Sequence, residues 1–220
     1  MESNFQKKII NKNTESINKS NYFDYFKKRT INEESIDKSN YSDFLKSNYE
    51  FINNIDIDKC ILNKNNITLL ENKFKKYIMN QEDILQYGND YESFEEELFT
   101  GCLVNTKDNC PVNGLIYERN EDMIYWYCSY IDGYKDDVLV KFYDNNNIKS
   151  IESISYNMLE GIYLKLNEEQ NLVELGKCHL GVKLKYYKFD KQKNIIESKE
   201  ELTRAESIII KTRERAMAKK

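Results

Sequence analysis

The sequence predicts an α+β protein with three parts: a mainly helical region over residues 1–95, a curled antiparallel β-meander of repeated hairpins over residues 96–198, and a basic amphipathic helix over residues 199–220. Three observations predict this class. Apolar residues recur at helical spacing in the first part, alternate with polar residues in the second, and gather on one helical face in the third. The chain has 220 residues, including 17 Tyr and 10 Phe, so it can bury a core without disulfides.

The helical region is uneven along its length. Residues 1–60 are rich in Asn, Ser and Lys, which is typical of a partly flexible segment with short helices. Residues 66–87 predict a helix, because apolar residues recur there at spacings near three and four: Leu69, Leu70, Phe74, Tyr77, Ile78, Ile84 and Leu85. Thr68 precedes Glu71 by three positions, as in a capping box, so we expect the helix to begin at Thr68.

The alternating region contains a motif that recurs about every 24 residues. Its copies are FYDNNNI, LNEEQNL and FDKQKNI, at residues 142–148, 166–172 and 189–195. Their Asn147, Asn171 and Asn194 lie 24 and 23 residues apart, and a second set of turn residues lies 24 and 24 apart: Gly133, Asn157 and Gly181. Asn and Gly tolerate positive φ, so both sets predict hairpin turns. The spacing therefore predicts a repeated hairpin and a meander of about seven or eight strands.

The C-terminal segment predicts a helix with one apolar face, made by Leu202, Ala205, Ile209 and Ala216. Basic residues follow late in it, where the helix dipole favours them. We expect this helix either to cap the last hairpin or to contact a partner or nucleic acid.

Composition narrows the class of protein. The net charge is −4, and a concentrated basic field is present only in residues 199–220, so nucleic-acid binding is not favoured outside that helix. No apolar run is long enough for a membrane span or a signal peptide, which predicts a cytoplasmic protein. The five cysteines are odd in number and lack CxxC spacing, so we expect reduced thiols. Abundant Asn, Lys, Ile and Tyr indicate an AT-rich genome, such as that of a bacterium, a phage or a protist.

Catalytic signatures are weak throughout the sequence. The single histidine, His179, adjoins Cys178, but neighbours on a strand point to opposite faces and cannot share a proton. Acidic pairs, at Asp56 with Asp58 and at Asp136 with Asp137, lack the ligand count of a calcium loop. We therefore predict no enzyme activity, no catalytic residue, no metal and no cofactor, although a hydrolase within residues 1–95 stays open.

The hairpin units resemble the bacterial MORN-variant repeat of YwqK-type antitoxin proteins over residues 96–198. The residues that carry the resemblance are Tyr130, Gly133, Phe142, Tyr143, Asn147, Gly161, Tyr163, Asn171, Gly181, Tyr186, Tyr187 and Asn194. The resemblance implies an interaction protein without an active site. Such a protein would neutralise a partner, as an immunity protein, an antitoxin or a phage-encoded inhibitor of a host enzyme does. The alternative is a MORN-type structural or membrane-associated scaffold, whose basic C-terminal helix would attract anionic lipid.

Alternation along the strands predicts which residues bind the partner. One face is expected to carry two neighbouring rows, Leu139, Tyr163 and Tyr186 beside Lys141, Lys165 and Lys188. An aromatic row beside a basic row predicts a contact surface for an acidic protein such as a toxin or a host enzyme. Changing both tyrosines to alanine is then expected to abolish binding and leave thermal unfolding nearly unchanged. The alternative is a solvated face whose lysines are balanced by Glu174 and Glu197.

Overall fold

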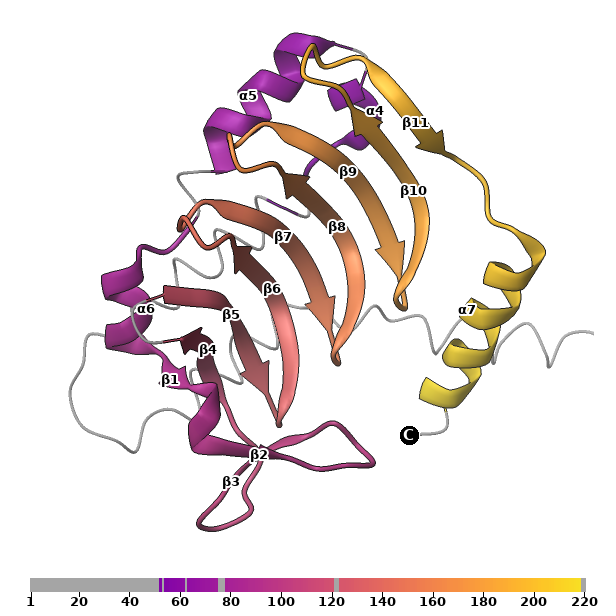
Figure 1. Ribbon diagram of the computed structural model, residues 1–220. Coiled ribbons are helices and arrows are strands. Elements are labelled where there is room, and N and C mark those ends of the chain that lie inside the picture. The colour runs from indigo at the N-terminus through magenta and orange to yellow at the C-terminus, as the bar shows by residue number, and fades with distance from the viewer. Residues whose placement is uncertain (1–51, 53, 62, 75–77, 121–122, 219–220) are drawn as a thin grey trace, which may run out of the picture. The chain divides into compact units, whose positions relative to one another are not determined.

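The computed structural model describes residues 52, 54–61, 63–74, 78–120 and 123–218 (Figure 1). They belong to one compact unit, Ser47–Lys220. The expectation of a partly flexible segment over residues 1–60 falls mostly outside the described residues.

The helical part contains separate short helices: α4 (Ile57–Ile61), α5 (Lys64–Phe74) and α6 (Gln81–Tyr87). The predicted capping box at Thr68 is wrong. Thr68 lies inside α5, where its hydroxyl donates to the Lys64 carbonyl oxygen. The break before α6 has a local cause, because the Asn80 side chain accepts a hydrogen bond from the Asp83 backbone N–H and starts a new helix.

A nine-stranded sheet follows, in the order β1-β4-β5-β6-β7-β8-β9-β10-β11. Its strands are β1 (Asn89–Asp90), β4 (Gly114–Asn120), β5 (Met123–Ile131), β6 (Tyr134–Phe142), β7 (Ile148–Ser155), β8 (Met158–Leu166), β9 (Leu172–His179), β10 (Val182–Phe189) and β11 (Ile195–Lys199). Only the short β1 pairs in parallel, with β4. A 3-10 turn, η3 (Tyr91–Ser93), leads to a separate hairpin of β2 (Phe94–Glu96) and β3 (Leu103–Asn105). The predicted α+β class with a large antiparallel sheet is therefore confirmed.

Three two-residue turns join the strands at one end of the sheet. They are Asp132–Gly133, Tyr156–Asn157 and Leu180–Gly181, with φ of 50° and 82°, 49° and 62°, and 49° and 75°. Positive φ at both central residues is the signature of a type I′ hairpin, whose twist matches that of the strands. The prediction that Gly133, Asn157 and Gly181 occupy positive-φ turn positions is therefore confirmed.

The turns at the other end of the strands differ in detail from the prediction. Positive φ falls on Asn146, Gln170 and Lys193, one residue before the predicted asparagines. Instead, the carbonyl oxygens of Asn147, Asn171 and Asn194 accept hydrogen bonds from the backbone N–H groups of Tyr143, Asn167 and Asp190 and so close each turn. The sequence located these turns, but it assigned the left-handed backbone to the wrong member of each pair.

One face of the sheet, which we call the apolar face, carries a continuous buried row. Paired across seven strands are Tyr117, Tyr127, Val140, Ile151, Leu164, Leu175 and Tyr187. The N-terminal helical segment meets this face: the Met79 N–H donates to the Tyr127 hydroxyl at 3.1 Å, and Lys185 bonds Asp58 of α4 at 2.5 Å. Burial of apolar residues from both layers makes the core here.

The opposite face changes character from one end of the sheet to the other. Its central row runs Ile116, Cys128, Leu139, Glu152, Tyr163, Gly176, Tyr186 and Lys199. The first three belong to a buried cluster that includes Leu103 of β3. The expectation that Leu139 lies on an exposed face is therefore wrong, because the β2–β3 hairpin covers this end of the sheet. The remaining part, over β7 to β11 together with Lys141 near the end of β6, we call the polar face.

The last helix, α7 (Arg204–Met217), begins at Thr203 with a capping box to Glu206. It packs on the β9–β10 hairpin through Ile210, which joins Leu180 and Val182. The apolar face predicted for this helix is wrong in phase, since Leu202, Ala205, Ile209 and Ala216 are exposed and Ile210 is the buried residue.

Candidate functional site

The polar face is built on a row of five charged side chains and one serine that the strand register sets side by side. Across β6 to β11 the row reads Lys141, Ser150, Lys165, Glu174, Lys188 and Glu197. The pairing register shifts directly after each of the three lysines, at the strand end before the turn. Opposite charges directly across a strand pair stabilise each other, so the row is both a structural and an electrostatic feature.

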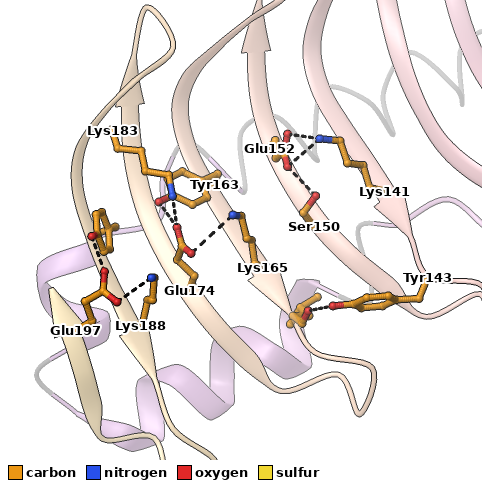
Figure 2. Close-up of polar contacts among 12 residues, drawn as sticks. Lys141, Tyr143, Ser150, Glu152, Tyr163, Lys165, Glu174, Lys183, Lys188 and Glu197 are labelled. Carbon is orange, nitrogen blue, oxygen red and sulfur yellow. Dashed lines mark hydrogen bonds and ion pairs between the residues drawn. The ribbon is translucent and has the colours of Figure 1, made fainter. Parts of the chain in front are cut away.

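Glu174 is the centre of this face. The Lys183 ammonium and the Tyr163 hydroxyl each donate to its Oε1 at 2.6 Å, and Lys165 lies 3.7 Å from its Oε2 (Figure 2). The Glu174 side chain is only 8% exposed. Burial by itself raises the pKa of Glu174, but the hydrogen bonds from Lys183 and Tyr163 outweigh it, and the net shift is downward. Glu174 is therefore held as a carboxylate.

Tyr163 is buried, contrary to the expectation that it belongs to an exposed row. It is 1% exposed, and its ring lies over Gly176, where an added Cβ would stand 2.5 Å from the ring. Desolvation, followed by the bond to Glu174, raises the pKa of Tyr163 well above the usual range. Changing Tyr163 to alanine would therefore disturb the fold, so the two-tyrosine substitution no longer separates binding from stability.

Tyr186 remains partly exposed at the edge of the same cluster. Its hydroxyl donates to Glu197 Oε1 at 2.6 Å, and Lys188 bonds Glu197 Oε2 at 2.8 Å. The Lys183 ammonium lies 5.1 Å from the Tyr186 ring centroid and 5.2 Å from that of Tyr163. This amine bridges both aromatic rings as well as the buried carboxylate.

A second, smaller cluster lies on β6 and β7. Lys141 bonds Glu152 Oε2 at 3.0 Å, and the Ser150 hydroxyl donates to Glu152 Oε1 at 2.8 Å (Figure 2). Glu152, like Glu174, is mostly shielded from solvent by the residues that bind it. The pattern of a shielded acid beneath a lysine is thus present twice.

Of the six predicted contact residues, the structure gathers four around Glu174 and Glu197: Tyr163, Lys165, Tyr186 and Lys188. Lys141 belongs to the neighbouring Glu152 cluster, and Leu139 is in the core. The ion pairs expected in the solvated-face alternative, with Glu174 and Glu197 as partners of the lysines, are present. Lys183 and Gly176 were missed. A signal for Gly176 was the lone glycine within an otherwise strand-like run.

The lysine and glutamate side chains of the polar face differ in how far they are exposed to solvent. The four lysine side chains Lys141, Lys165, Lys183 and Lys188 are 36–43% exposed, whereas those of Glu152 and Glu174 are 10% and 8% exposed. Above Glu152 and Glu174 the amines therefore form the outer layer, whereas Glu197, the partner of Lys188, is itself 47% exposed. Such a surface presents cations and aromatic edges to whatever approaches it, on a chain with net charge −4.

Cys178 and His179 are adjacent in the sequence, but their side chains lie in different environments. Cys178 is buried, and burial raises the pKa of its thiol to about 11. His179 instead places Nδ1 2.8 Å from Glu160 of β8 and Nε2 3.5 Å from Glu214 of α7. Among the described residues, no group of three or more His, Cys, Asp or Glu side chains is placed to hold a metal ion.

Comparisons with protein-family models, curated proteins and solved structures find no match to this chain. Within the described part of the chain, none of the helices combines the length and apolarity needed to cross a membrane.

Proposed function

We propose that this chain is a non-enzymatic protein-binding module, and that its polar face binds an acidic surface of a partner protein and thereby neutralises that partner. The observation that carries the proposal is the layering of charge, with half-exposed lysines above shielded glutamates. Because Glu152 and Glu174 already hold the amines in place, little side-chain freedom is lost when an acidic partner binds.

The proposed role is that of an immunity protein, an antitoxin or a phage-encoded inhibitor of a host enzyme. The hairpins are proposed as MORN-variant-like units. Support comes from the three type I′ turns, whose second residues Gly133, Asn157 and Gly181 lie 24 residues apart, and from the lysine that is second-last in one strand of each unit, at Lys141, Lys165 or Lys188. A rigid face built this way suits stoichiometric binding.

The test is affinity capture with the tagged full-length chain in extract of its source cell, followed by affinity measurement with the captured protein. The variant Lys165→Gln with Lys188→Gln removes two exposed charges and keeps both apolar stems. We expect its affinity to fall about tenfold or more. Lys177→Gln is the matched control, since Lys177 is exposed and its register places it on the apolar-face side. An equal loss of affinity in the Lys177→Gln control, or no loss of affinity in the double variant, would contradict the proposal.

A membrane-associated scaffold is the second candidate, and α7 favours it. Arg204, Lys211 and Arg215 of this helix are exposed, and none has an ion-pair partner among the described residues. Such cations are attracted to anionic lipid surfaces. Salt-sensitive cosedimentation with phosphatidylserine vesicles, lost when the three are changed to glutamine, would favour the scaffold over the protein-binding module. Absence of cosedimentation would rule out the membrane-associated scaffold.

A further inference from the structure

The turn between β2 and β3 exposes two large apolar side chains. Leu98 is 95% exposed and Phe99 is 101% exposed, more than any other large apolar residue among those described. The turn is nevertheless ordered by its own hydrogen bonds, from the Gly101 N–H to the Glu97 carbonyl and from the Thr100 hydroxyl to the Glu97 side chain. We call residues 95–99 the acidic tip, since they read Glu-Glu-Glu-Leu-Phe.

An adjacent leucine and phenylalanine that contribute nothing to the core are typical of an interaction site. The charge of the neighbouring residues limits the kind of surface that Leu98 and Phe99 can contact. Residues 89–101 contain five acids, Asp90, Glu92, Glu95, Glu96 and Glu97, and no Lys or Arg, so the segment carries a formal charge of −5. The surface that receives the tip must therefore offer both apolar area and cations.

This chain has such a surface in the groove between α7 and the strands β10 and β11. The groove is lined by Val182, Lys183, Tyr186, Lys199, Ile209 and Arg213, among others. Ile209 faces it and is 41% exposed, because α7 buries only Ile210 against the sheet. The groove lining has three cations (Lys183, Lys199, Arg213) and two acids (Glu201, Glu206), a formal charge of +1. Groove and tip are complementary in both polarity and charge.

The β2–β3 hairpin and α7 both lie toward the end of the strands that carries the two-residue turns (Figure 1), and Gly181 of one such turn lines the groove. The Gly101 carbonyl oxygen, at the base of the tip, accepts a hydrogen bond of 2.9 Å from Asn157 in the β7–β8 turn. The next residue, Met158, packs against the cluster of Leu180, Val182 and Ile210 beneath α7. Tip and groove therefore border neighbouring hairpins.

We propose that the chain self-associates, with Leu98 and Phe99 of one copy seated in the α7 groove of a second copy. Because tip and groove border the same end of the sheet, a two-fold pair makes this contact twice and closes as a dimer. Burial of the two apolar side chains drives the contact, and the opposite charges orient it. The groove shares Lys183, Tyr186 and Lys199 with the polar face, whereas Leu98 and Phe99 lie outside that face.

The first experiment is sedimentation equilibrium of the full-length chain over a range of concentrations. A monomer–dimer equilibrium is expected that weakens between about 50 and about 500 mM salt, because screening removes the attraction between tip and groove. Leu98→Ser with Phe99→Ser is expected to raise the dimer dissociation constant about 100-fold, with an unchanged circular dichroism spectrum. Leu69→Ser, at a half-exposed leucine of α5, is the control and leaves the equilibrium unchanged.

A mixing experiment tests the reciprocal geometry. Ile209→Asp disables the groove and keeps the tip, whereas the Leu98 and Phe99 double variant keeps the groove. Each variant alone is expected to be monomeric, and an equimolar mixture is expected to form a heterodimer through the one intact contact. A wild-type chain that stays monomeric, a double variant that still dimerises, or a mixture without association each overturns the proposal.

Discussion

The two faces of the sheet shield their side chains from solvent by different interactions. Leu164 and Tyr163 are neighbours in the sequence, point to opposite faces, and are 0% and 1% exposed. Leu164 is buried within an apolar row that spans seven strands. Tyr163 is shielded within a polar cluster, with its hydroxyl on Glu174 and its ring over Gly176.

The difference teaches that low exposure by itself does not identify the core. On the apolar face, stability follows from the area removed from water. On the polar face it depends on satisfied charges, so removing one partner leaves another buried and unpaired. The two faces should therefore respond differently to substitution and to pH, and the following predictions run from the largest expected effect to the smallest.

Leu164→Ala is expected to cost about 3 kcal/mol of unfolding free energy, because it opens a cavity in the middle of the apolar row. Urea denaturation followed by circular dichroism measures the effect. Ile196→Ala, at a residue of β11 that is 66% exposed, is the control and should change stability by less than about 0.5 kcal/mol. Equal costs for the two would mean that the row is not the core.

Gly176→Ala is expected to cost about 2 kcal/mol, because the new Cβ meets the Tyr163 ring at 2.5 Å. The cause is tested by a double-mutant cycle in urea. In a Tyr163→Ala background the same glycine substitution should cost almost nothing, since the ring is gone. A cost that persists in that background would assign the effect to the backbone instead.

Glu174→Gln is expected to cost about 1 kcal/mol at neutral pH, because the amide keeps an acceptor for Tyr163 but loses the charge that binds Lys183. The folded-state pKa of Glu174 is lowered from 4.5, so its contribution is present above that value and is lost as pH falls through the folded pKa. Wild type and variant should therefore converge in acid. Stability curves that stay parallel to low pH would show that the carboxylate charge is not what matters.

His179→Gln is expected to have the smallest effect, a few tenths of a kcal/mol, because the ring is more than one third exposed. Burial lowers the pKa of His179, but Glu160 and Glu214 outweigh it and raise the net value above 6.5. This contribution is complete below the unfolded value and is lost as pH rises through the folded pKa.

Hydrogen exchange locates this effect on α7, because Glu214 belongs to that helix. Protection of the α7 amides in wild type should decrease as the pH rises from 6.5 through the raised folded-state pKa of His179, while protection in the variant should not show this decrease. A wild-type profile as flat as the variant's would show that the imidazolium does not hold α7.

Much of the fold was predictable, because it depends on local patterns. Alternation located the strands, and glycine and asparagine located turns such as Asp132–Gly133. Helix boundaries and phase were less accurate. Thr68 was taken for a cap because its neighbours fit the motif, and the buried face of α7 was assigned to Ile209 instead of Ile210, since nothing local indicates which side of a short helix meets a sheet.

The candidate site was only half predictable. Alternation placed Lys141, Lys165 and Lys188 on one face, and their register confirms that row. Alternation does not show how deep a side chain lies, so Tyr163 was expected on the surface and Leu139 beside it. Depth depends on what covers each strand, and the covering residues come from distant parts of the chain.

The sequence by itself determined the class of the fold, the hairpin turns and the alternation of faces, because these follow from backbone preference and from the period of two along a strand. Only the tertiary structure decided which half of the second face is covered by the β2–β3 hairpin, that Lys183 reaches Glu174, and that Leu98 and Phe99 stay exposed. These features arise from contacts between residues far apart in the chain. Such contacts depend on register and packing, and no local pattern encodes them.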